Sequence, residues 1–284
     1  MKRLVLMTLV AMCAGAAFAA VADRAPCASG ITPASGSAPD AWGQMVRSFA
    51  VLPSSGTNST GAVTTYDNYF LTGMWSAFNM FYVYTTAGSF VRSVTASSPS
   101  AGFRDGTGGC HLGNGYFVAG GGGPGLYGYY TYAAGGNPGS VAAGNLMSAG
   151  RGIGWNGTYY YAVTGNWSTA VAEYSTTGSQ IRTIPYGTGV PIYGVAAHPS
   201  QPTYIYAYTQ ETGNPLKQVV IASGSVVKSF TTGGMAGGAD AGGTGSYLYL
   251  VGQDPTRFCW VYDGEISGSG VAPKSLGIIR AIFR

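Results

Sequence analysis

The chain has 284 residues, and its 14 basic and 10 acidic side chains make up only 8% of them, against ~25% in ordinary domains. Its 47 glycines exclude a coiled coil and argue against a helical bundle, because each glycine inside a helix costs ~1 kcal/mol. With 46% apolar residues and 21 tyrosines the chain can bury a core, so we expect one glycine-punctuated all-β domain. The formal charge of +4 is spread thinly, which excludes the clustered basic surface that nucleic acids need.

Residues 1–19 have the pattern of a secretory signal peptide: two basic residues, an apolar stretch over 4–15, and the small-x-small site Ala17-Phe18-Ala19. We therefore expect a secreted protein, found outside the cell or at the cell surface, with no membrane insertion after cleavage. Residues 20–41 carry three prolines and are expected to form an extended N-terminal linker.

Three cysteines follow the signal peptide: Cys27, Cys110 and Cys259. In an oxidising compartment this odd number allows one disulfide and one thiol, and the sequence leaves the pairing open. No two of them have the C-x-x-C spacing of a zinc site, and no acidic loop has the pattern of a calcium site. We expect neither a metal nor a cofactor.

The main feature of the remaining chain is a repeat of about 45 residues, marked by tyrosine-rich runs. The runs begin 47, 43, 45 and 43 residues apart, at Tyr69, Tyr116, Tyr159, Tyr204 and Tyr247. A short segment predicted as a first strand precedes each run, at 62–65, 109–112, 152–155, 194–197 and 238–241. The turn between the two strands is Asn114-Gly115 in one copy and Asn156-Gly157 in another. Because Asn-Gly favours the type I′ turn, each pair predicts a β-hairpin.

A third and a fourth strand are predicted after each hairpin. The third strands, rich in β-branched and aromatic residues, lie at 80–84, 129–132, 170–174, 218–221 and 258–262. The clearest fourth strands follow a Gly-Ser turn, at 88–93, 178–183 and 224–229, and carry Arg or Lys at one fixed position. A basic side chain on an outermost strand opposes edge-to-edge pairing between molecules.

Four short strands in each unit of 40–50 residues indicate the blades of a β-propeller. Over residues 42–266 the chain resembles secreted bacterial β-propeller repeat proteins, although the Gly-His and Trp-Asp dipeptides of WD40 repeats and a regular kelch pattern are missing. The resemblance and the repeat together predict an all-β propeller of about five four-stranded blades, with six still open.

Ring closure is predicted from the segment 43–49, which matches the fourth-strand segment 224–230 almost position for position. It precedes the first complete repeat, and the last repeat has a poor fourth strand of its own. We therefore expect 43–49 to form the outer strand of the last blade, with Met45, Val46 and Phe49 as the closing side chains.

Residues 267–284 form a Gly/Ser/Pro spacer and an apolar, strand-like tail. The tail's apolar side chains are those of Leu276, Ile278, Ile279, Ile282 and Phe283. Three interpretations stay open: a strand packed on its own ring, a strand donated to a neighbouring copy, or a tail recognised by an export or attachment system.

Catalytic sequence motifs are absent, including G-x-S-x-G, H-E-x-x-H and the phosphate-binding loops. Cys110 and His111 are adjacent on a predicted inner strand, where neighbours point to opposite faces, so we expect no catalytic pair. Asp105 and Asp240, near the starts of inner strands, are the carboxylates that a propeller hydrolase would use. On balance the sequence predicts that the protein is not an enzyme.

Exposed aromatic side chains are the remaining candidates for ligand binding. Trp75 and Trp167 follow Thr72-Gly73 and Thr164-Gly165 in corresponding loops between second and third strands. The leading hypothesis is a secreted structural or interaction protein that self-assembles into a filament or surface layer, with itself as partner. The alternative is a lectin-like propeller that binds glycans, and the third option is a hydrolase.

Overall fold

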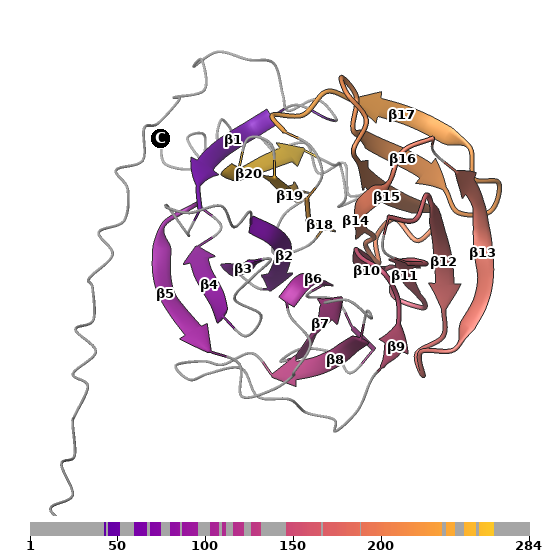
Figure 1. The fold of residues 1–284 in the computed structure, drawn as a ribbon, viewed down its shortest axis with the longest axis horizontal. Helices are drawn as coiled ribbons and strands as arrows, with labels where there is room; N and C mark the ends of the chain where they lie inside the picture. The colour runs from indigo at the N-terminus through magenta and orange to yellow at the C-terminus, as the bar shows by residue number, and fades with distance from the viewer. Residues whose placement is uncertain are drawn as a thin grey trace, which may run out of the picture.

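The fold was analysed in a computed structural model. It describes residues 43, 45–51, 60–66, 69–74, 80–85, 87–95, 103–107, 110–111, 116–121, 126–131, 146–165, 167–187, 189–234, 237–241, 247–253 and 256–263. These residues form five four-stranded antiparallel sheets arranged around a common axis (Figure 1). None of them belongs to a helix long and apolar enough to cross a membrane. The predicted all-β propeller is thus confirmed, and the five-blade alternative is the one observed.

In blades 1 to 4 the strands follow their order along the chain, from the axis outwards. Blade 1 contains β2 (Thr60–Tyr66), β3 (Tyr69–Met74), β4 (Met80–Thr85) and β5 (Phe90–Thr95). Blade 2 contains β6 (Phe103–Thr107), β7 (Tyr116–Gly121), β8 (Leu126–Thr131) and β9 (Met147–Ser148). Blade 3 contains β10 (Ile153–Trp155), β11 (Tyr160–Val163), β12 (Ala170–Tyr174) and β13 (Gln180–Gly187). Blade 4 contains β14 (Ile192–Ala196), β15 (Tyr204–Thr209), β16 (Leu216–Val220) and β17 (Val226–Phe230).

The ring closes as predicted, with an N-terminal strand on the last blade. Blade 5 contains β18 (Ala239–Ala241), β19 (Tyr247–Gln253), β20 (Thr256–Asp263) and, outermost, β1 (Met45–Ala50). Phe49 lies opposite Cys259 in this pairing, and its ring packs 6.3 Å from that of Tyr84 in blade 1. Met45 is 43% exposed, so it contributes less to the closure than Phe49 does. The first and last blades are therefore joined without a covalent bond.

Blade 2 departs from the prediction at its inner strand. The segment 109–112 was expected to be that strand, but the inner strand is β6, and Cys110 and His111 lie in the connection between β6 and β7. The short apolar segment 109–112 resembles the inner strands of the other blades in sequence. The strand that pairs with β7 is nevertheless β6, which also contacts β2 of blade 1 and β10 of blade 3. The third strand of this blade also begins earlier than expected, at Leu126.

The hydrophobic core lies between the blades rather than at the axis. One buried cluster joins blades 2 and 3, a second joins blades 3 and 4, a third joins blades 4 and 5, and another joins blades 5 and 1. The second strands supply fully buried tyrosines to these clusters, namely Tyr160, Tyr161, Tyr206, Tyr208 and Tyr249. Packing between neighbouring blades thus accounts for the tyrosines inside each run, whereas the first tyrosine of a run, such as Tyr69 or Tyr159, is exposed.

Glycines in the turns before the outer strands fix how closely two blades approach. Gly178 and Gly224 have φ of +80° and +71°, values that side chains other than glycine adopt at a cost. A Cβ atom on Gly178 would collide with the carbonyl of Leu146 in blade 2, and one on Gly224 with that of Pro185 in blade 3. The Gly-Ser turns of the repeat therefore serve both the turn and the contact between blades.

Two faces of the ring follow from the antiparallel order of the strands. The hairpin face carries the turns between first and second strands and between third and fourth strands, such as 156–159 and 175–179. The entry face carries the turns between second and third strands, such as 164–169, and the segments that lead into each blade, such as 149–152.

Candidate functional site

A turn on the entry face of blade 3 presents Trp167. Thr164 and Ala170 close the turn through a backbone hydrogen bond of 3.1 Å between the Thr164 amide and the Ala170 carbonyl. The Ser168 hydroxyl lies 2.7 Å from that of Thr164 and accepts the Ala170 amide at 3.1 Å. The Ser168 carbonyl accepts the amide of Ile192 in blade 4 at 3.0 Å. The turn is therefore held both internally and by the next blade.

Trp167 is unusual in its backbone and in its exposure. Its φ is +60°, and no other non-glycine residue in the described part of the chain has a positive φ. A bulky side chain rarely adopts this conformation, which is found where the surrounding structure enforces it, often at functional sites. The residue is 61% exposed, the largest exposure among the large hydrophobic residues that the structure describes.

Two side chains from other segments hold the indole ring. The guanidinium carbon of Arg151, in the segment leading into β10, lies 4.9 Å from the centre of the Trp167 ring and 4.3 Å from that of Tyr193 on β14. Tyr193 meets Trp167 edge to face, with ring centres 5.8 Å apart and an angle of 87°. Arg151 and Tyr193 are themselves buried. The exposed indole is thus a rigid platform supported by a buried cation and a second ring.

Sequence reasoning found Trp167 but missed Arg151 and Tyr193. Arg151 follows Gly150 at the end of a connection between blades, and Tyr193 is one of many tyrosines at the repeat spacing. Neither has a local signal that distinguishes it from a packing residue. Trp75, the other predicted ligand residue, lies outside the described residues, as do the tail residues Leu276, Ile278, Ile279, Ile282 and Phe283. The assignments of these residues to ligand binding and assembly stay predictions.

The predicted carboxylates lie on innermost strands, as expected. Asp240 is in the middle of β18, opposite Tyr249 of β19, and has no exposed surface. Asp105 is on β6, but its side chain is outside the described part of the structure. A hydrolase that uses this pair would need both carboxylates at a surface that a substrate can reach. The burial of Asp240 does not meet that requirement.

Cys110 and His111 lie on the hairpin face, so the expectation that His111 is on an inner strand is wrong. Nδ1 of His111 is 3.1 Å from the hydroxyl of Tyr160, and its ring also lies near that of Trp155. Cys110 is buried in the cluster between blades 2 and 3 with Tyr160 and Trp155, whereas Cys259 is buried between blades 5 and 1. No disulfide joins these two cysteines. Cys27 lies outside the described residues.

Metal-binding clusters of three or more His, Cys, Asp or Glu side chains are not found where the structure describes the chain. The side chains brought together at the Trp167 turn are aromatic and basic, which are poor ligands for hard cations.

Comparison with known proteins found similar structures but no similar sequence. No protein-family model matches the chain, and no curated protein matches it in sequence. Among solved structures it is similar to the glutaminyl cyclase of Myxococcus xanthus, with 13% identity over 78% of this chain and 94% of that one and a TM-score of 0.53. The WD40 domain of Neurospora crassa Pan2 covers 72% of this chain and 62% of its own, with 13% identity and a TM-score of 0.40. The computationally designed protein Ika8 covers 72% of this chain and 70% of its own, with 9% identity and a TM-score of 0.37.

The glutaminyl cyclase corrects one prediction. The absence of catalytic motifs was taken to exclude an enzyme, and this exclusion is wrong, because a structure that aligns over 94% of its own length with this fold is that of an enzyme. Motifs such as G-x-S-x-G belong to other folds, so their absence carries no weight on a propeller. At 13% identity the likeness concerns the fold alone.

Proposed function

We propose that the protein is an exported β-propeller that binds glycans on the entry face of its ring, through the Trp167 turn. The observation that carries the proposal is the combination of a 61% exposed indole and a φ of +60° at Trp167. An exposed ring costs hydrophobic free energy, and a positive φ costs a further ~1–3 kcal/mol. A ligand that packs on the indole would recover the first of these costs.

The support beneath the ring favours a sugar over a cationic ligand. Aromatic rings attract cations through their faces, but Arg151 already lies over Trp167 and would repel a second positive charge. The apolar C–H face of a pyranose ring can pack on the remaining indole surface without that penalty. Neutral and acidic glycans are therefore the ligands that the cluster fits.

Export is part of the proposal and is supported by the sequence alone. The pattern of residues 1–19 is that of a signal peptide, and glycans outside the cell would then be the accessible ligands.

The experiment compares binding of a panel of neutral and acidic polysaccharides to the wild type and to Trp167→Asn. Asparagine tolerates positive φ, so this variant keeps the turn while it removes the platform. We expect binding to fall by about 5- to 150-fold, because stacking on an aromatic ring is worth ~1–3 kcal/mol. The control is Tyr69→Ala, which removes a 39% exposed ring from the hairpin face and should leave binding unchanged. Equal affinity of Trp167→Asn and wild type for every bound polysaccharide would refute the proposal.

A second candidate function is suggested by the glutaminyl cyclase. The same fold in this chain could support cyclisation of a glutaminyl substrate, with loss of ammonia. It ranks second because Asp240, the described carboxylate on an innermost strand, has no exposed surface. Mass spectrometry of a peptide with N-terminal glutamine, incubated with wild type and with Asp240→Asn, tests it. Turnover by the wild type that is lost in the variant would favour this activity.

A further inference from the structure

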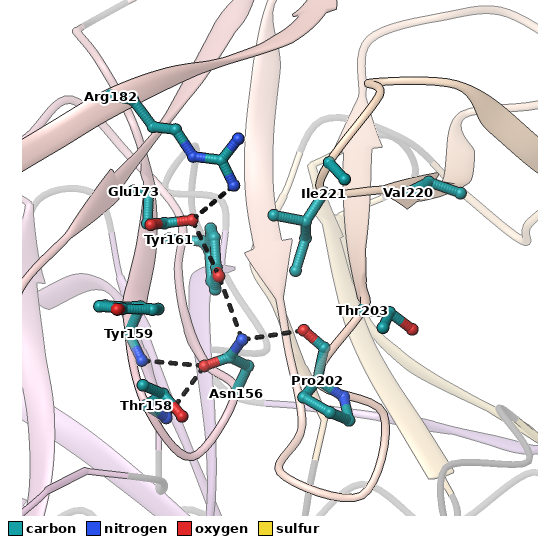
Figure 2. A pocket seen from close by; sticks show the side chains of 11 residues that line it. Asn156, Thr158, Tyr159, Tyr161, Glu173, Arg182, Pro202, Thr203, Val220 and Ile221 are labelled. Atoms are coloured by element: carbon teal, nitrogen blue, oxygen red, sulfur yellow. Dashed lines mark hydrogen bonds and ion pairs between the residues drawn. The ribbon is translucent and has the colours of Figure 1, made fainter.

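A pocket opens on the hairpin face, between blades 3 and 4 and on the opposite side of the ring from the Trp167 turn (Figure 2). Its volume is about 390 Å³, within the usual ~300–1,000 Å³ of small-molecule sites. Blade 3 supplies Asn156, Thr158, Tyr159, Tyr161, Glu173 and Arg182, and blade 4 supplies Pro202, Thr203, Val220, Ile221 and Ala222. One wall is thus polar and the other mostly apolar.

The polar wall is built around Glu173, a carboxylate that is only 5% exposed. Its Oε2 accepts hydrogen bonds from the Tyr161 hydroxyl at 3.2 Å and from Nη2 of Arg182 at 3.0 Å. Burial, together with the nearby carboxylate, raises the pKa of Tyr161 well above its usual range, since both disfavour a phenolate. The tyrosine hydroxyl is therefore a proton donor to Glu173 at all ordinary pH values.

Asn156 fixes this arrangement through its own hydrogen bonds. Its Nδ2 donates to the Tyr161 hydroxyl at 3.1 Å and to the carbonyl of Pro202 in blade 4 at 3.0 Å. Its Oδ1 accepts the backbone amides of Thr158 and Tyr159 at 3.0 and 2.9 Å. All four hydrogen-bonding positions of the amide are occupied, so Asn156 is a positioning residue.

Glu173 and Arg182 each keep hydrogen-bonding capacity that the described residues do not use. Oε1 of Glu173 has no hydrogen-bond partner among the residues described, and Arg182 makes one hydrogen bond within that set out of the five that a guanidinium can donate. Figure 2 shows Arg182 and Glu173 directed toward one another on one wall, with Ile221 on the other. An acceptor and a donor therefore lie side by side, next to an apolar surface.

The charges on the polar wall favour a neutral ligand. The charges of Glu173 and Arg182, which lie 3.0 Å apart, cancel one another. An anionic ligand would be repelled by the carboxylate, and a cationic ligand would be repelled by the guanidinium. A neutral group that offers one N–H and one C=O satisfies both partners at once. A primary carboxamide has this pattern, because one of its N–H bonds lies on the same side as its carbonyl, and an apolar substituent on it would contact Ile221 and Val220.

We propose that this pocket binds a small neutral ligand through a carboxamide, with the N–H donating to Glu173 Oε1 and the carbonyl accepting from Arg182. The exposed ring of Tyr159, at the rim, would contact the rest of the ligand. The trans amide of a peptide bond or of an acetamido sugar points its N–H and its C=O in opposite directions, so the ligand must carry a primary carboxamide. This site is independent of the one proposed at Trp167.

The test titrates isobutyramide, isobutyrate and N,N-dimethylisobutyramide into the full-length protein, with binding measured by NMR or calorimetry. Both controls keep the apolar substituent, but isobutyrate is an anion and the dimethyl amide has no N–H. We expect isobutyramide to bind at least ~10-fold more tightly than either control. Equal binding of all three compounds, or failure of isobutyramide to bind at millimolar concentration, would overturn the proposal.

Variants then locate the site. Arg182→Gln should weaken amide binding at least ~10-fold, whereas Lys228→Gln, at the corresponding position of blade 4, should change it less than about 2-fold. Ala222→Tyr blocks the mouth of the pocket without touching the ion pair, and it keeps the test valid if Arg182→Gln does not fold. Amide binding that survives both Arg182→Gln and Ala222→Tyr, or that is lost only in Trp167→Asn, places the ligand elsewhere and overturns the proposal.

Discussion

Glu173 and Gln218 occupy the same position in consecutive blades. Each lies on a third strand, between a second-strand tyrosine and a basic residue of the outer strand: Tyr161 and Arg182 for Glu173, Tyr206 and Lys228 for Gln218. Each contacts the tyrosine hydroxyl, at 3.2 Å for Glu173 and 3.3 Å for Gln218. Blade 4 is therefore a natural model of blade 3 in which an uncharged amide replaces the carboxylate.

This relationship predicts how blade 3 responds to substitution. Glu173→Gln should lower the free energy of unfolding by less than about 1 kcal/mol, because the amide can still meet Tyr161 and because Arg182, whose side chain is 43% exposed, can turn to water. Glu173→Ala removes the acceptor of a buried hydroxyl and should cost about 1–3 kcal/mol. Urea denaturation of both variants gives the comparison, and equal losses would contradict the assignment.

Alkaline pH should unfold the ring before the buried tyrosines ionise in the native state. Burial raises the pKa of Tyr249 and of Tyr262 to about 12, against 10.0 for a free tyrosine. Between these values the unfolded chain has lost the proton that the native chain keeps, so native stability is fully present below pH 10 and is lost as the pH rises toward 12. We expect tyrosinate absorbance and circular dichroism to change together over this range.

The control for the alkaline transition is Tyr249→Phe, which cannot ionise. It should retain more of its neutral-pH stability above pH 10 than the wild type does. A wild-type protein whose fold persists unchanged while its tyrosines titrate one by one near their ordinary pKa would show that they are not buried as described.

Deletion of residues 43–50 should open the ring at blade 5. Phe49 pairs with Cys259 on β20, and burial raises the pKa of this thiol well above its usual range, which makes it unreactive in the closed ring. Without β1 the thiol should become accessible, so its labelling by a thiol reagent, followed by peptide mapping, should speed up by at least ~10-fold. Cys110, buried between blades 2 and 3, is the internal control and should label at its original rate. Unchanged labelling of Cys259 in the shortened protein would argue that β1 is dispensable for closure.

Gly224→Ala should destabilise the protein more than Gly213→Ala. Both glycines have positive φ, of +71° and +95°, so alanine introduces backbone strain of about 1–2 kcal/mol at either position. Only at Gly224 does the added Cβ also collide with the carbonyl of Pro185 in the neighbouring blade, whereas nothing lies within 4 Å of Gly213. Thermal melts of the two variants measure the difference, and equal melting temperatures would mean that blade 3 and blade 4 can move apart at no cost.

Trp75 should contribute to glycan binding in the same way as Trp167, since each comes two residues after a Thr-Gly pair, which lies at the end of the second strand in blade 1 and directly after it in blade 3. If each indole contacts one end of an extended glycan, Trp75→Ala in the Trp167→Asn background should weaken binding of a long polysaccharide by a further ~10-fold. The matching measurement with a short oligosaccharide should show no further loss. A double variant that binds the long polymer as the single variant does would restrict the site to blade 3.

Features that repeat along the chain were decided by the sequence alone. The spacing of Tyr69, Tyr116, Tyr159, Tyr204 and Tyr247 follows from a hairpin in every blade, and strand pairing within a hairpin depends on local turn residues and alternation. Ring closure was also predictable, because 43–49 repeats the outer-strand pattern of 224–230 before any complete blade. The pairing of β1 with β20 confirms it.

What joins separate blades was decided only by the tertiary structure. Arg151, Trp167 and Tyr193 come from the lead into β10, the turn after β11 and the start of β14, and no periodicity relates them. The pocket likewise needs Glu173 of blade 3 opposite Ile221 of blade 4. The inner strand of blade 2 was misplaced for the same reason. The segment 109–112 has the local pattern of a strand, but β6 is the segment that lies beside β2 of blade 1 and β10 of blade 3. Contacts between blades depend on how twisted sheets pack face to face, and that packing is set by side chains distant in the sequence.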